Sequence, residues 1–156
     1  MRTYFSVVGA IDVEVLGQFV ASRLSLPRDQ VCVYDNIWLI DPPAQGAPAG
    51  PLWDAYAHSL VGVQMGHYEP NAGPVCGWFS LEKGRSLEPS EVRSFARAAA
   101  AFLDAPILFP DPAPGDTSQY ADAAQIEVTP EGVERKVWLS EFGEKGRTRN
   151  LIEARD

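Results

Sequence analysis

The sequence of 156 residues lacks a long apolar run, and it holds only two cysteines and two histidines. No stretch approaches the roughly 18–20 apolar residues that a membrane-spanning helix needs. Residues 1–16 alternate apolar and polar side chains and soon reach two acidic ones, which differs from the plan of a signal peptide. We therefore expect a cytoplasmic protein with no membrane partner.

The scarcity of cysteine and histidine also limits the metal and disulfide chemistry of the chain. Cys32 and Cys76 are too few for a disulfide framework, and their apolar neighbours in QVCVY and PVCGW are typical of buried thiols. A metal site made of both cysteines with His58 and His67 would have gaps of 26, 9 and 9 residues, whereas structural zinc sites supply ligands as close pairs. The sequence therefore predicts no metal ion and no cofactor.

Catalytic signatures are missing as well. The chain has no G-x-G-x-x-G, no Walker lysine, no G-x-S-x-G and no H-E-x-x-H. The stretch MGHYEPNAGPVCGWF offers Cys76 as a nucleophile with His67 as its base, but a nucleophilic cysteine prefers a strained turn or a helix N-terminus. Here Cys76 falls inside a predicted strand. We interpret the stretch as two strands and their turn, with Cys76 in the core and no catalytic residue.

The net charge of −8 excludes a general nucleic-acid binder, which needs a basic patch. Residues 1–82 carry eight acidic and three basic side chains, and residues 83–144 carry eleven and six. Only residues 145–156 reverse the balance, with four basic side chains and two acidic ones. An acidic body is either a soluble surface or a means of steering a basic partner.

The apolar periodicity predicts alternating strands and helices. The clearest helix is EPSEVRSFARAAAAFLDAP, where Pro89 suits the first turn and Pro106 ends the pattern. A second helix follows the N-cap candidate Asp12 and stops before Pro27. The remaining patterns predict strands at residues 3–10, 60–68, 73–84 and 107–109, and a short helix before residue 60. Residues 30–41 form either one long strand or two short ones, and residues 125–142 form two strands joined at residues 130–132.

Together these elements predict an α+β or α/β protein. We expect a single-layer, mixed or mostly antiparallel sheet of about five to seven strands with two main helices packed on one face. The chain should begin with a β-α-β unit and end with a β-hairpin. Residues 1–144 would form one globular domain, and residues 145–156 a polar C-terminal tail.

Two proline-rich segments, residues 41–51 and 110–124, mix acidic side chains with aromatic ones in or beside them. Aromatic side chains are rigid contact anchors, and acidic ones attract a basic partner. His67 and Glu69 stand at the end of a predicted hairpin, where a binding surface would use them. The predicted partner-binding residues are Trp53, Asp54, Tyr56, His67, Glu69, Asp111, Asp116, Tyr120 and Asp122.

The profile resembles that of bacterial immunity proteins and similar small cytosolic inhibitors, which are compact, acidic, intracellular and free of catalytic motifs. The likeness is one of composition and class. It implies a protein-binding module that neutralises a toxin enzyme, with a basic toxin domain as its partner. Two alternatives stay open: a small enzyme or ligand-binding domain with a dispersed site around His58, His67 and Glu69, and a structural or assembly subunit.

Overall fold

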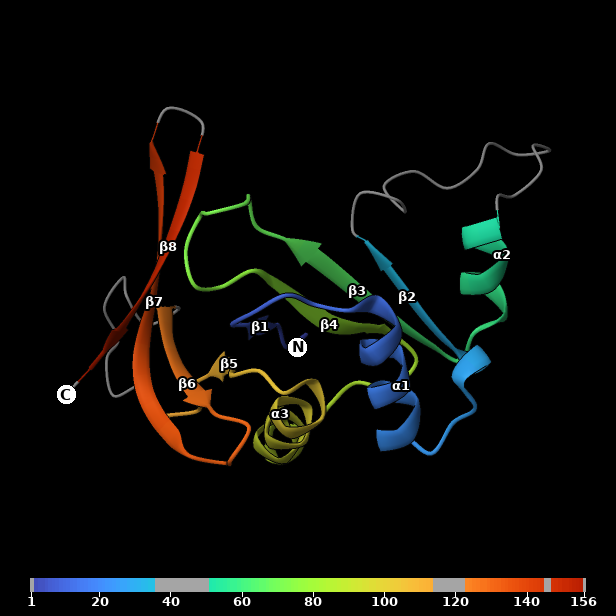
Figure 1. The fold of residues 1–156 in the computed structure, drawn as a ribbon. Coiled ribbons are helices and arrows are strands. Elements are labelled where there is room, and N and C mark those ends of the chain that lie inside the picture. Colours follow the sequence, from blue (N-terminus) through green and yellow to red (C-terminus); the bar gives the residue numbers. More distant parts are fainter. Residues whose placement is uncertain (1, 36–50, 114–122, 145–146, 156) are drawn as a thin grey trace.

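The computed structural model describes residues 2–35, 51–113, 123–144 and 147–155, which form one mixed sheet with three α-helices (Figure 1). The protein is therefore of mixed α and β content, as its sequence predicts. The elements in chain order are β1 (Phe5–Val7), α1 (Val13–Arg23), the short 3-10 helix η1 (Arg28–Gln30), β2 (Val31–Asp35), α2 (Pro51–His58), β3 (Val61–His67), β4 (Gly77–Lys83), α3 (Pro89–Leu103), β5 (Ile107–Pro110), β6 (Ala124–Val128), β7 (Glu134–Glu144) and β8 (Arg147–Ala154).

The sheet has eight strands in the order β2-β3-β4-β1-β5-β6-β7-β8. Only the pair β2 and β3 is parallel, and the other six pairs are antiparallel. The β-α-β start is present, but β3 and β4 lie between β1 and β2 in the sheet. Local sequence patterns carry no information on strand order, so the position of β3 and β4 between β1 and β2 could not be predicted from the sequence.

Local capping explains where the two main helices begin and end. The Asp12 carboxylate accepts the backbone N–H groups of Glu14 and Val15 at 2.9 and 3.0 Å, which satisfies two donors that open α1. At the start of α3 the Glu91 side chain accepts the Glu88 N–H at 2.9 Å. The helix stops at Asp104, whose left-handed φ of 53° ends the hydrogen-bond ladder.

The helices α1 and α3 cover one face of the sheet and enclose the main core between them (Figure 1). Phe5 of β1 lies 5.2 Å from Phe79 of β4 and 5.3 Å from Phe95 of α3, measured between ring centroids. Phe19 of α1 meets Phe95 edge-on. All four rings are almost fully buried, so the helix-covered face is held by apolar burial.

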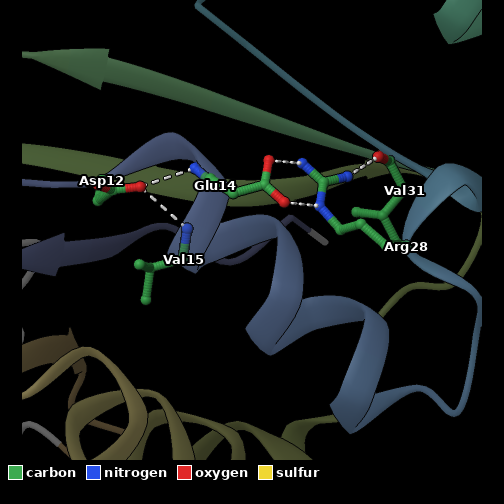
Figure 2. A network of polar contacts seen from close by, with 5 residues as sticks. All are labelled: Asp12, Glu14, Val15, Arg28 and Val31. Atoms are coloured by element: carbon green, nitrogen blue, oxygen red, sulfur yellow. Dashed lines mark hydrogen bonds and ion pairs between the residues drawn. The ribbon is translucent and has the colours of Figure 1, made fainter.

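A polar network ties α1 to the edge strand β2 (Figure 2). The Arg28 guanidinium donates to both carboxylate oxygens of Glu14 at 3.1 and 3.2 Å and to the Val31 carbonyl at 2.6 Å. Gly17 makes room for this contact, because a Cβ there would lie 2.3 Å from Arg28 Nη2. The network therefore links α1, through Arg28 of η1, to the first residue of β2.

The strand count exceeds the prediction because residues 147–154, within the expected polar tail, form β8. β8 pairs with β7, so the predicted hairpin of β6 and β7 is present but a second hairpin follows it. The turn between β3 and β4 closes over β8: the Asn150 N–H donates to the Ala72 carbonyl, and its side chain exchanges two bonds of 2.9 Å with the Val75 backbone. This contact covers an edge that would otherwise expose unpaired backbone groups.

The third helix, α2, lies beyond β2 and contacts the face that α1 and α3 leave open (Figure 1). Its Tyr56 reaches Glu82 of β4, which points away from the main core. None of the helices in the described part of the chain is long and apolar enough to cross a membrane.

Candidate functional site

The strand register divides the side chains between a helix-covered face and a second face. Phe5, Met65 and Phe79 are cross-strand partners and belong to the main core. Because side chains alternate along a strand, their sequence neighbours point to the other side. The second face on β1 to β4 carries the side chains of Ser6, Cys32, Tyr34, Gln64, Trp78, Ser80 and Glu82.

Glu82 is the centre of the polar contacts on the second face. Its Oε2 accepts the hydroxyl of Tyr34 at 2.7 Å and that of Tyr56 at 2.8 Å, and Oε1 receives Tyr56 at 3.1 Å. The register of β3 and β4 shifts at Gly62 and Val63, so β4 carries one extra residue here. An added Cβ on Gly62 would lie 3.1 Å from Tyr56 Cε2 and 3.2 Å from Glu82 Oε2, so the absence of a side chain makes room.

The two tyrosines keep their protons in this arrangement. Burial, followed by the hydrogen bond to Glu82, raises the pKa of Tyr34 well above its usual value. The same causes raise the pKa of Tyr56 to about 12. Both hydroxyls therefore remain donors at neutral pH, and they hold the Glu82 carboxylate in one orientation.

Lys83 holds the last turn of α2. Its Nζ donates to the carbonyl oxygens of Tyr56 at 2.6 Å and of Ala57 at 3.3 Å, in the last turn of the helix. A cation is favourable there because the helix C-terminus carries partial negative charge. The ammonium also lies 4.7 Å from the centre of the Tyr56 ring, and Trp53 meets that ring edge-on at 5.8 Å.

A second group of side chains lies on the strands beside this cluster. Tyr4 meets Trp78 edge-on with ring centroids 5.3 Å apart. The Arg2 guanidinium lies 5.6 Å from the centre of the Tyr4 ring and donates to Gln64 Oε1. We call the aromatic and carboxylate side chains of this face, Tyr4, Tyr34, Trp53, Asp54, Tyr56, Trp78 and Glu82, the tyrosine face.

Three predicted binding residues lie together on α2. Trp53 and Tyr56 contact each other, and Asp54 between them is exposed. His67 and Glu69 are exposed at the far end of β3, where His67 Nε2 lies 4.0 Å from Asp35 Oδ2. These predicted binding residues therefore belong to two separate surfaces, one on α2 and one at the far end of β3.

The dispersed site around His58, His67 and Glu69 is not assembled. His58 precedes β3, its Nδ1 lies 2.7 Å from the Asp54 carbonyl oxygen, and His67 is the last residue of β3. Strand β3, with a rise of about 3.3 Å per residue, places the backbone of Val61 and of His67 roughly 20 Å apart, and His58 lies before its start. The two histidines cannot act on one small substrate across that distance.

Cys76 and Asp111 lie in surroundings that the sequence did not predict. Cys32 is buried as expected, but the prediction of a buried Cys76 is wrong: Val75 enters the core, and the next side chain in the extended chain points outward to solvent. Asp111 is buried and ion-paired with Arg155, so its carboxylate does not lie on the surface. Asp116, Tyr120 and Asp122 lie outside the described residues.

Sequence reasoning missed Tyr4, Tyr34, Trp78 and Glu82 as members of the tyrosine face, and Arg2 and Lys83 as cations beside it. The alternation WFSLEK placed Trp78 and Glu82 on one side of a strand, which was the available signal. Their contact with Tyr34 and Tyr56 depends on the order of the strands. Local patterns carry no information on that order.

In the described ranges, no group of three or more histidine, cysteine, aspartate or glutamate side chains is arranged to hold a metal ion. The chain matches no protein-family model, no curated protein and no solved structure in the comparisons with known proteins. Its function is therefore argued from the site alone.

Proposed function

We propose that this protein is an acidic protein-binding module of the immunity type, which neutralises a basic toxin enzyme through its tyrosine face. The observation that carries the proposal is the gathering of tyrosine, tryptophan and carboxylate side chains on the face that α1 and α3 leave open. Tyrosine and tryptophan are enriched in the centres of protein interfaces, because they bury a large area at a small entropy cost.

Charge supports the same proposal. The chain carries a net charge of −8, and Asp54 and Glu82 add exposed carboxylates beside the aromatic rings. A negative surface speeds the encounter with a basic partner and disfavours acidic ones. Blocking a cationic substrate cleft needs this combination of negative charge and rigid aromatic contacts.

The test begins with capture on immobilised protein from cells of the source organism, and it continues with the captured enzyme. We expect one stoichiometric basic protein whose enzymatic activity is inhibited by added wild-type protein. The association rate should fall as salt rises, because exposed charges are screened beyond about 8–10 Å at 0.10–0.15 M salt. Inhibition, rather than capture, decides the question.

Matched variants locate the surface. Trp53→Ala and Asp54→Asn on α2 should weaken inhibition, whereas Glu131→Gln, an exposed charge change in the turn between β6 and β7, should not. Absence of an inhibited partner, or equal inhibition by all variants, would contradict the proposal.

A further inference from the structure

A groove with a volume of about 230 Å³ opens where the N-terminal segment passes the end of β4. Its lining consists of Arg2, Thr3, Leu81, Glu82, Ser86 and Leu87. This volume is below the usual range for drug-sized ligands, roughly 300–1,000 Å³, and suits a smaller molecule. The groove thus combines a cation, an anion, two hydroxyls and two leucines.

The two charged groups of the groove are each held by other side chains. Tyr34 and Tyr56 hold Glu82 chiefly through Oε2, and Oε1 takes only the longer contact from Tyr56. Arg2 is held by Gln64 and by the Tyr4 ring, and it makes no hydrogen bond to any other described residue. Both groups are therefore oriented while keeping bonding capacity for a ligand.

Opposite charges that line one groove usually pair. Arg2 and Glu82, both described, form no ion pair with each other. A ligand that carries both charges would bind the two groups at once: its carboxylate would accept from the guanidinium, and its ammonium would donate to Glu82 Oε1. A ligand with a single charge would be repelled by one of the two groups: an anion by Glu82, or a cation by Arg2.

We propose that this groove binds a free α-amino acid, with Arg2 on the carboxylate and Glu82 on the ammonium. The parts of Leu81 and Leu87 that are not packed against the main core would lie beside its side chain. The leucines favour an apolar amino acid over a charged one. This ligand site goes beyond the proposed protein-binding function and shares Glu82 with the tyrosine face.

The experiment is a thermal-shift screen of the natural α-amino acids, followed by titration calorimetry of those that raise Tm. Leucine is the first probe, and two analogues serve as controls: 4-methylpentanoate lacks the ammonium, and 3-methylbutylamine lacks the carboxylate. We expect saturable binding of at least one apolar amino acid and at least tenfold weaker binding of both analogues. The proposal is overturned if no amino acid binds, or if an analogue binds as tightly as leucine.

Variants assign the two charged contacts. Arg2→Gln, at an exposed position, and Glu82→Gln should each weaken binding at least tenfold, whereas Arg149→Gln on β8 should leave it unchanged. Glu131→Gln, in the turn between β6 and β7, should also leave it unchanged. Binding that survives both Arg2→Gln and Glu82→Gln would contradict the assignment.

Discussion

The two faces of the sheet use different aromatic residues. The helix-covered face is filled by phenylalanine, with Phe5, Phe79 and Phe95 in mutual contact and almost fully buried. The second face carries tyrosine and tryptophan, and Tyr4 remains 47 % exposed. Phenylalanine has no group that needs a hydrogen bond, whereas tyrosine and tryptophan need a polar partner when they are buried.

This difference shows which face of the sheet contributes most of the apolar burial. Burial of apolar area is the dominant favourable contribution to folding, and the main core lies on the helix-covered face. On the second face the tyrosines contact the Glu82 carboxylate, the Lys83 ammonium and the Arg2 guanidinium. On this face Tyr34 is buried, whereas Tyr4, Asp54 and Glu82 are exposed.

Replacing adjacent residues of β4 compares the two faces most strongly. Phe79→Ala should lower the free energy of unfolding by about 3–5 kcal/mol, because it leaves a cavity in a fully buried site. Trp78→Ala, on the partly exposed second face, should cost less than half as much. Urea unfolding followed by circular dichroism measures both. Equal losses would mean that the faces do not differ in their contribution to stability.

The turn over β8 is the next test, because polar contacts hold it. Asn150→Ala should cost about 2–4 kcal/mol, since it leaves the buried N–H and carbonyl of Val75 without partners. The same unfolding measurement applies. A loss below about 1 kcal/mol for Asn150→Ala would contradict this account.

A smaller effect is expected at Glu82. Tyr34→Phe removes one donor from the carboxylate and should cost about 1–2 kcal/mol, because the Tyr56 hydroxyl still donates to it. Tyr4→Phe is the control, since the exposed Tyr4 ring needs no buried partner, and it should change stability by less than about 0.5 kcal/mol. Indistinguishable values for the two variants would argue against a fixed carboxylate.

Alkaline pH probes the same tyrosines with the smallest change to the molecule. Their folded-state pKa values are raised, so the folded protein holds protons that the unfolded chain loses above about pH 10. The stability from this difference is present below pH 10 and is lost as the pH rises towards about 12, the pKa of Tyr56. Unfolding free energies measured from pH 9 to 12 should fall, and Tyr56→Phe should reduce the slope. An unchanged slope would contradict the raised pKa.

Local patterns in the sequence predicted the elements that local chemistry determines. The caps and apolar stripe of α3, the short helix α2 and the hairpin of β6 and β7 all follow from spacing within a few residues. By contrast, β8 pairs with its chain neighbour β7, but its sequence RTRNLIEA has no clear apolar alternation. The bonds of its Asn150 side chain reach Val75, seventy-five positions away. Polar pairs of that separation leave no periodic signal.

The candidate site was predicted only in part for the same reason. Trp53, Asp54 and Tyr56 stood out as a local group, and they lie together on α2. Their link to Glu82 depends on the placement of β2, β3 and β4 side by side. The burial of Asp111 depends on Arg155, forty-four positions further along the chain.

The central claim is that the tyrosine face binds the partner and the helix-covered face does not. The most direct measurement is the affinity of the captured basic enzyme for two variants that each remove one aromatic side chain: Trp53→Ala on α2 and Phe102→Ala on α3, where Phe102 is 45 % exposed. The account predicts that Trp53→Ala raises Kd by about thirtyfold or more, equivalent to roughly 2 kcal/mol, and that Phe102→Ala leaves Kd unchanged. A loss with Phe102→Ala and none with Trp53→Ala would contradict it.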